Sequence, residues 1–340
     1  MSGSHAGPSP GGATGPEVVT GPEVVTTELV AVVVAVRHGV PEVLTRRTDD
    51  GAALPSGPLR TGHRSLQAAT REWVETQTGL RLGHVEQLYT FADRDRVDAA
   101  HRVISVTYLG LTRDTGAAGG QEAGWTSWYE HFPWEDRRHG AGDAAGSALV
   151  GALMDWAAAD PDQADARRAR CGATFGLAGA DWLPDLCLQR YELLWEAGLV
   201  AEALRAEPPG SASGGLAPSL DPLAGEPTIS GVPLPHDHRR ILATGMARLR
   251  ATIQYRPVVF ELLPDAFTLS ELQACVEAVA GERLHTQNFR RLIQQQELVE
   301  ETGEVDASTG GRPARLFRFR RQVHALRRLV GTKLPLPRRR

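Results

Sequence analysis

The chain has 340 residues, of which 41% are hydrophobic, and a formal net charge of −4, so sizeable cores and two domains are expected. It has no apolar run of about 18 residues, which argues against a transmembrane helix, and no basic-then-apolar N-terminus, which argues against a secretory signal. Its three scattered cysteines fit neither a disulfide framework nor a paired-cysteine metal site, and they suit buried thiols in a reducing cytoplasm.

The first third of the chain predicts a small sheet with one helix. Residues 1–27 are rich in Gly, Pro, Ser and Thr and repeat the hexapeptide GPEVVT, so we expect a disordered tail. The β-branched runs that follow predict strands, and the order of strands and helix suits a small α/β or α+β sandwich. The predicted elements are strands at Glu28–Arg37, Pro41–Arg47, Val85–Phe91 and Arg102–Thr112, a loop at Thr48–Ser56 and a helix at Ser65–Thr76.

The middle of the chain predicts an aromatic segment followed by helices. Thr115–Ala123 is expected to be a loop, and the proline-rich stretch Glu207–Pro233 an interdomain linker. Helices are predicted near 145–158, 162–173 and 183–204, and the last could serve dimerisation or pack on its own domain. The aromatic side chains between loop and helices could stack on a nucleobase, or could seal a sheet edge or a dimer contact. These aromatic residues are Trp125, Trp128, Tyr129, Phe132 and Trp134.

The C-terminal part predicts a winged helix-turn-helix. Thr268 and Glu271 form a capping box that opens a helix ending at Gly281, and Thr286 can cap a second helix. Helix, helix, turn, helix and hairpin is the order of a winged helix. The remaining predicted elements are an amphipathic helix at His236–Ile253, an apolar piece at Pro257–Leu263, the second helix at Gln287–Gln296, and strands at Leu298–Glu301 and Arg315–Arg320.

The outward face of that second helix predicts DNA contacts. Gln, Asn and Arg side chains pair with adenine and guanine edges in the major groove, and the wing arginines lie beside glycines that let backbone approach phosphate. Residues 236–340 hold 19 Lys and Arg against 11 Asp and Glu, whereas the remainder holds 18 against 30. A solvated polar face or a protein-docking module is the alternative. The candidates are Gln287, Asn288, Arg290, Arg291 and Gln294 on the helix, with Arg312 and Arg315 in the wing.

The histidines at the start of the C-terminal part could suggest a metal site. His236 and His238 flank Asp237 at the start of the amphipathic helix. Adjacent residues at a helix start are more often a cap with polar neighbours than metal ligands. We therefore predict that Asp237 caps the helix and that no metal binds here.

The stretch Gly57–Leu80 (GPLRTGHRSLQAATREWVETQTGL) resembles a Nudix box, the loop–helix–loop that holds metal for cleaving nucleoside diphosphates. The family pattern is Gly, five residues, Glu, seven residues, then Arg-Glu-hydrophobic-any-Glu-Glu-any-Gly. From Gly57 the upstream Glu is replaced by His63, and the second Glu of the pair by Thr76. Anchoring from the closing glycine backwards would replace every acid, so we prefer the first register. In that register Arg71, Glu72, Trp73 and Glu75 match, and the closing glycine is displaced to Gly79.

Both halves together resemble the Nudix-related transcriptional regulators of the NrtR family. The resemblance rests on LPSGP, WVETQTGL and VEQLYTFADRDR in the first half and on LHTQNFRRLI and GGRPARLFRF in the second, and spans roughly 28–112 and 236–320. It implies a dimeric repressor of NAD biosynthesis or salvage genes, released from a palindromic operator by ADP-ribose or a related nucleotide. The DNA contacts it implies are Thr286, Gln287, Asn288, Arg290, Arg291 and Arg312.

The altered box favours a ligand sensor over an enzyme. A working site needs several carboxylates around Mg²⁺, and two acidic positions are lost, so we expect neither a catalytic residue nor a required cofactor, and Mg²⁺ binding is disfavoured. Arg46 and Arg47 end a predicted strand and could grip a diphosphate, or be merely exposed. The alternative is an ADP-ribose pyrophosphatase with a winged helix for assembly. The expected ligand contacts are Arg46, Arg47, Arg71, Glu72 and Glu75.

The predicted fold is α+β, with a Nudix-like α/β/α sandwich, a helical segment and a winged helix-turn-helix. The protein is expected to be a cytoplasmic homodimer without membrane association. The predicted divisions are a tail at 1–27, an effector-binding domain at 28–140, a helical extension at 141–205, a linker at 206–235, a DNA-binding domain at 236–330 and a basic tail at 331–340.

Overall fold

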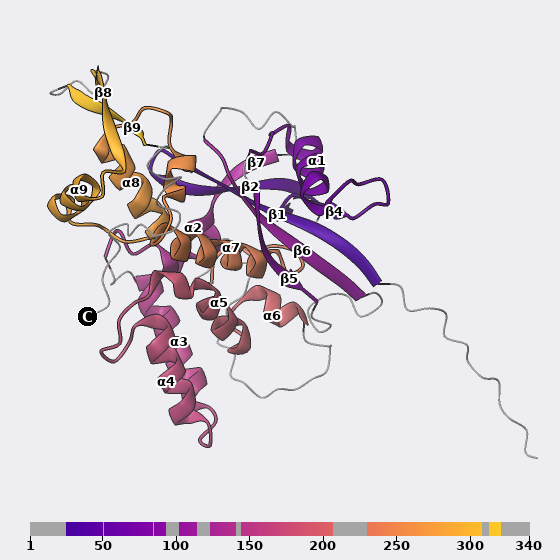
Figure 1. Ribbon diagram of the computed structural model, residues 1–340. Coiled ribbons are helices and arrows are strands. Elements are labelled where there is room, and N and C mark those ends of the chain that lie inside the picture. The colour runs from indigo at the N-terminus through magenta and orange to yellow at the C-terminus, as the bar shows by residue number, and fades with distance from the viewer. Residues whose placement is uncertain are drawn as a thin grey trace, which may run out of the picture.

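A long β-branched strand, β1 (Val25–Arg37), runs through the centre of a seven-stranded sheet (Figure 1). Its residues 29–35 are all buried, because side chains on both faces are covered. The computed structural model describes residues 25–49, 51–83, 85–92, 102–113, 123–140, 144–206, 230–307 and 313–320. The predicted tail, linker and basic end lie almost wholly outside these residues, although Val25–Thr27 belong to β1.

The sheet has the order β3-β2-β1-β6-β5, with β4 on β1 and β7 on β2. β1 is antiparallel to β2 and β4 and parallel to β6. His38 and Gly39, with φ of 50° and 74°, make the tight turn between β1 and β2, as expected for a two-residue hairpin. The other strands are β2 (Val40–Thr48), β3 (Gly51–Ala53), β4 (Ser56–Pro58), β5 (Val85–Phe91), β6 (Arg102–Leu111) and β7 (Ala123–Ser127).

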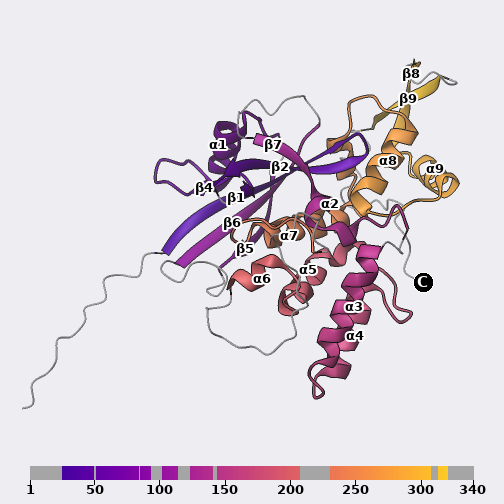
Figure 2. The same ribbon diagram turned by 180° about the vertical axis from the view of Figure 1, so that it is seen from behind.

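Helices cover both faces of the sheet, which gives three layers (Figures 1 and 2). On one face, α1 (Leu66–Thr78) packs its Ala69 and Val74 against Leu29 and Val33. On the other, α7 (His238–Ile253) lies across β1, β5 and β6. A Cβ at Gly245 of α7 would lie 2.9 Å from Val32 Cγ1, so glycine permits this close approach of helix and sheet.

Two helices form an arm that projects from the body (Figure 1). α3 (Ala144–Ala158) and α4 (Ala164–Phe175) pack side by side through buried Leu149, Leu153, Cys171 and Phe175. The chain returns to the body through a short 3-10 helix, η2 (Pro184–Leu186). The predicted helix at 183–204 is broken, because Gly198 has a φ of 68°. It comprises α5 (Cys187–Glu196) and α6 (Ala201–Ala206).

The winged helix is the most C-terminal part of the described chain. Thr268 and Glu271 make both hydrogen bonds of the predicted capping box, and Gly281 ends the helix with a φ of 75°. The prediction for Thr286 was wrong: His285 occupies the N-cap position without a side-chain cap, and Thr286 is the first helical residue. The elements are η3 (Val258–Leu262), α8 (Leu269–Ala280), α9 (Thr286–Gln295), β8 (Val299–Asp306) and β9 (Ala314–Phe319), with Phe267 bridging to Phe317.

Several sequence predictions change in detail. The predicted loop at Thr48–Ser56 contains β3 and the first residue of β4, because this short piece pairs with β2. One hydrophobic cluster continues from the sheet face through α5 and α7 into the winged helix, so the predicted boundary at residue 236 divides the sequence and not the core. In the described part of the chain, no helix combines the length and apolarity needed to cross a membrane.

The aromatic segment is built into the core. It forms β7, then α2 (Trp128–His131), then a 3-10 turn, η1 (Pro133–Glu135). Trp128 and Phe132 are completely buried, and Tyr129 and Trp134 nearly so. This burial favours the structural alternative over stacking on a nucleobase for these four side chains.

Candidate nucleic-acid interface and ligand face

Helix α9 presents a polar face at the end of the molecule away from the sheet (Figure 1). Its apolar residues Phe289 and Ile293 are buried against α8 and the hydrophobic cluster. The helical repeat therefore turns the polar residues outward. Arg290 Nη2 lies 3.5 Å from Ser270 Oγ on α8, which ties one flank of this face to the preceding helix. The outward, exposed residues are Thr286, Gln287, Asn288, Arg290, Arg291 and Gln294.

A polar network holds the turn that leads into α9. Gln273 Nε2 donates to Glu277 Oε1 (2.8 Å), to the carbonyl of Leu284 (3.1 Å) and to Thr286 Oγ1 (3.2 Å). Glu277 Oε1 also accepts from the Leu284 amide (2.9 Å). These contacts fix the start of α9 relative to α8. Sequence reasoning missed Gln273 and Glu277, although their spacing from the predicted turn is compatible with such contacts.

The structure describes one of the two arginines that were predicted in the wing. Arg315 lies on β9 with its side chain 71% exposed, and its Nη1 is 2.7 Å from Glu301 Oε1 on β8. An exposed pair of this kind is weak and can be exchanged for a phosphate contact. Arg312 lies outside the described residues.

Helix α1 is capped and latched to the sheet. Ser65 Oγ accepts from the Ala68 amide, and Gly79 closes the helix in the left-handed conformation. The amide of Gln77 makes two hydrogen bonds with the backbone of Ser56, one donated at 2.7 Å and one accepted at 3.2 Å. This latch fixes the helix over β4.

The two remaining carboxylates of α1 face nitrogen groups from the chain itself. His63 Nε2 lies 3.7 Å from Glu72 Oε1, and His63 is fixed because its Nδ1 accepts from the Arg60 amide. Arg81 Nε donates to Glu75 Oε1 at 2.7 Å. A divalent cation favours several oxygen ligands with net negative charge, whereas this helix offers two carboxylates, one of which is paired with Arg81.

The residues present therefore do not fit a Nudix metal centre. Among the residues that the structure describes, no group of three or more His, Cys, Asp or Glu could hold a metal ion. At the motif positions, Thr76 offers a neutral hydroxyl, and Arg71 donates to the carbonyl of Gly83 at 3.1 Å.

Trp73 fills the hydrophobic position of the motif and lies against Gly57. A Cβ at Gly57 would be 2.3 Å from the indole ring. The indole Nε1 donates to the carbonyl of Pro58 at 3.2 Å, and the Arg60 guanidinium lies 4.4 Å from the ring centroid. The loop that precedes α1 is thus packed on Trp73.

Arg46 and Arg47 point to opposite faces of β2, because successive strand residues alternate. Arg46 shares its face with Leu44, which packs in the cluster under α1, and its Nε is buried without a hydrogen-bond partner among the described residues. Arg47 is exposed and lines a cavity of about 610 Å³ with Thr45 and Thr126. The two arginines therefore cannot grip the same phosphate, and Arg46 is the one that faces the α1 side.

The histidine pair at the start of α7 has a structural place. Asp237 occupies the predicted N-cap position, but its side chain makes no cap hydrogen bond and pairs instead with Arg240 at 3.2 Å. His238 is buried, and its Nδ1 accepts from the Leu54 amide at 3.1 Å. Burial lowers the pKa of His238 to about 3, with smaller contributions from His236 and Arg46. A neutral imidazole thus ties α7 to the sheet.

A buried ionic cluster joins the aromatic segment to α5 and α7. Glu135, Arg190 and Arg250 are all completely buried. Arg190 donates from Nε (2.5 Å) and Nη2 (2.9 Å) to the Glu135 carboxylate, and Arg250 Nη1 donates to the same carboxylate. Burial raises the pKa of Glu135, but the two guanidiniums outweigh it and hold the pKa below its usual range. No sequence signal pointed to this cluster.

Comparisons with known proteins agree with this architecture. Residues 259–319 match the family model described as the NrtR DNA-binding winged helix domain. A curated protein of Acinetobacter baylyi (strain ATCC 33305 / BD413 / ADP1), the ADPR responsive transcriptional repressor NtrR, is 38% identical over 86 residues. That match covers 25% of this chain and 34% of the relative, so it spans about a third of the relative's length.

Two solved structures share the overall fold. The structure of Shewanella oneidensis NrtR complexed with a 27mer DNA has a TM-score of 0.51 at 18% identity, covering 88% of this chain and 95% of that one. A MutT/nudix family protein from Enterococcus faecalis has a TM-score of 0.50 at 15% identity, covering 89% and 90%. The predicted fold class, a Nudix-like domain followed by a winged helix, is confirmed.

Proposed function

We propose that this chain, whose residues 259–319 match the NrtR DNA-binding winged helix domain, is a DNA-binding transcription regulator of that family that senses ADP-ribose or a related nucleotide. We propose further that it represses genes of NAD biosynthesis or salvage, and that it acts in the cytoplasm as a homodimer on a palindromic operator. A two-fold operator suits a two-fold dimer, because each recognition helix then meets one half-site.

The polar face of α9 carries the proposal. Its buried side is fixed on α8, while Gln287, Asn288 and Arg291 project into solvent from a helix at the edge of the molecule. These amide and guanidinium groups pair with adenine and guanine edges in two-point contacts, each of which contributes about 1–3 kcal/mol of discrimination. A solvated face alone would not require this choice of side chains.

The sheet domain is the proposed effector site. The A. baylyi relative is described as ADPR responsive, and Arg46 has a buried guanidinium nitrogen without a hydrogen-bond partner among the described residues. On the α1 side of the sheet, Arg46 and Arg71 are the proposed contacts for a diphosphate. Glu72 and Glu75 can accept hydrogen bonds from ribose hydroxyls. Arg47, which lines the cavity on the opposite face, is left out of this set.

Binding without cleavage is the second part of the proposal. Glu75 pairs with the Arg81 guanidinium, and Glu72 lies 3.7 Å from the His63 imidazole, so one of the two carboxylates that would gather a metal already has a cationic partner. An effector that survives its own binding can report its concentration, whereas a hydrolysed one is removed.

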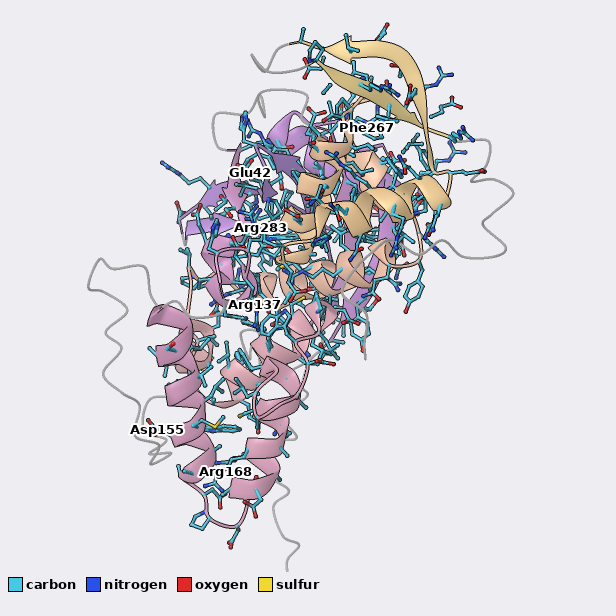
Figure 3. All side chains as sticks on the ribbon, turned by 90° about the vertical axis from the view of Figure 1, so that its left-hand side faces the viewer. Glu42, Arg137, Asp155, Arg168, Phe267 and Arg283 are labelled. Carbon is cyan, nitrogen blue, oxygen red and sulfur yellow. The ribbon has the colours of Figure 1, made fainter. Side chains whose placement is uncertain are left out.

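Fluorescence anisotropy on the DNA upstream of the gene tests the regulator. We expect specific binding, with the logarithm of the association constant falling linearly with the logarithm of salt concentration. Adding ADP-ribose should change the affinity for this DNA. Arg291→Ala should lower specific affinity about 5- to 160-fold. Arg168→Ala is the matched control, because this exposed arginine lies at the far end of the α3–α4 arm (Figure 3). Equal binding by Arg291→Ala and the control would contradict the assignment of α9.

Incubation with ADP-ribose and Mg²⁺ or Mn²⁺ tests the sensor. We expect the nucleotide to be recovered intact while calorimetry detects its binding. Turnover that Glu75→Gln abolishes would identify the chain as a pyrophosphatase instead.

A further inference from the structure

The last turn of α8 makes hydrogen bonds with the aromatic segment and with α7. The final carbonyls of any helix have no partner within it and must find one elsewhere. The Tyr129 hydroxyl donates to the carbonyl of Ala278 at 2.6 Å, and Arg250 Nε donates to that of Val279 at 2.9 Å. Tyr129 belongs to the aromatic segment, and Arg250 to the helix that crosses the sheet.

The turn between α8 and α9 contacts the residues that directly follow the aromatic segment. The Arg137 amide donates to the carbonyl of Gly281 at 2.8 Å, and Arg283 Nε donates to that of Arg138 at 3.3 Å. Arg137 and Arg283 lie on these neighbouring stretches of chain (Figure 3). A Cβ at Gly281 would lie 2.2 Å from the carbonyl oxygen of Glu135, so only a glycine allows the two backbones to approach this closely.

The segment itself is rigidly attached to the sheet. It continues directly from β7, which pairs with β2 from Glu42 to Arg46. Arg138 makes two hydrogen bonds of 2.8 Å to the carboxylate of Asp136 and donates from Nη1 to the carbonyl of Gly39, in the β1–β2 turn. The chain from β2 to the α8–α9 turn is therefore a continuous series of packed and hydrogen-bonded groups.

We propose that residues 129–138 of the sheet domain set the orientation of the recognition helix, and that Tyr129 is a positioning residue for DNA recognition. The proposal rests on the DNA-binding role assigned to α9. Tyr129 touches no DNA in this arrangement, because it is buried against α8. It acts by holding the helix-turn-helix at one angle to the sheet, so that two copies present their α9 helices at one spacing.

The orientation has a measurable consequence on paired half-sites. A rigid dimer is matched to one half-site spacing, whereas a loosely held winged helix adapts to several at a cost in affinity. Loss of the Tyr129 hydrogen bond should thus weaken binding to the paired site but spare a single half-site. It should also reduce the penalty for changing the spacing by one base pair.

The test compares Tyr129→Phe with Tyr89→Phe in the full-length protein by anisotropy. Tyr89 is a control, because it is 60% exposed on β5. We expect Tyr129→Phe to lose about fivefold in affinity for the paired site, the size expected for one hydrogen bond of about 1 kcal/mol, and under twofold for a half-site. Arg283→Gln should show the same pattern, whereas an arginine that simply contacts phosphate would lose affinity on both.

Each other outcome counts against the inference. If wild type binds the paired site and Tyr129→Phe behaves as Tyr89→Phe does, the positioning role is wrong while the proposed function stands. If Tyr129→Phe loses paired-site and half-site affinity equally, together with thermal stability, the residue only supports the fold. If wild type binds no DNA, the proposed function fails and the inference fails with it.

Discussion

Replacing Glu135 by glutamine should be the most destabilising conservative change in the described part of the chain. The carboxylate is the ion-pair partner of two guanidiniums, those of Arg190 and Arg250, and all three groups are completely buried. Removing one partner of a buried ion pair leaves an uncompensated charge, at a cost of about 3–5 kcal/mol. A domain of ordinary stability has about 5–15 kcal/mol in total, so the variant should lie near the limit of folding.

Urea unfolding followed by tryptophan fluorescence measures this loss directly. The midpoint should fall at an unchanged slope, since the surface exposed on unfolding stays the same. Glu196→Gln is the control, because Glu196 pairs with Arg170 at a half-exposed site, where a pair contributes about 0–1 kcal/mol. A loss below about 1 kcal/mol for Glu135→Gln would refute the reasoning, because the buried charges would then be compensated by other groups.

Three further predictions concern local packing, capping and pH. Gly57→Ala should destabilise the protein by about 1–3 kcal/mol through its clash with the Trp73 ring. When Gly57→Ala is added to Trp73→Leu, thermal unfolding should show most of that loss removed relative to Trp73→Leu alone. Thr268→Ala should lower the free energy of unfolding by about 1 kcal/mol, because it removes the cap of α8; an unchanged urea midpoint would contradict this. Because the folded-state pKa of Glu135 is lowered, its stabilisation is present above its unfolded pKa and is lost as pH falls through the folded one. Wild type should therefore lose stability in acid more steeply than Glu135→Gln, and parallel acid-unfolding curves would contradict that cause.

Local patterns predicted the elements, because the physics that forms them is local. The β-branched run of β1 and the capping box at Thr268 each depend on residues within a few positions of one another. The polar face of α9 followed from the helical repeat alone, since Phe289 and Ile293 identify the buried side. His285 took the cap position from Thr286, which shows the usual uncertainty of one residue at a helix end.

Long-range partners were beyond the reach of the same patterns. Glu135 lies 55 residues from Arg190 and 115 from Arg250, and a charged residue in a sequence is ordinarily exposed. The sequence predicted an amphipathic helix at α7, but it did not predict which surface of the sheet this helix covers. The altered Nudix positions could be identified in the sequence. The contacts of Glu72 with His63 and of Glu75 with Arg81 became apparent only in the structure.

The placement of α7 also has a consequence for how this protein can be re-engineered. Gly245 packs this helix on Val32 of the sheet, while Arg250 further along it reaches Val279 in α8. A helix that is shared in this way cannot be exchanged with either half alone. A chimera that imports a foreign winged helix after residue 258 must keep the partner carbonyls of Arg250, and one that imports α7 as well must also match the sheet. Successful domain swaps should therefore be those that move α7 together with both of its contact surfaces.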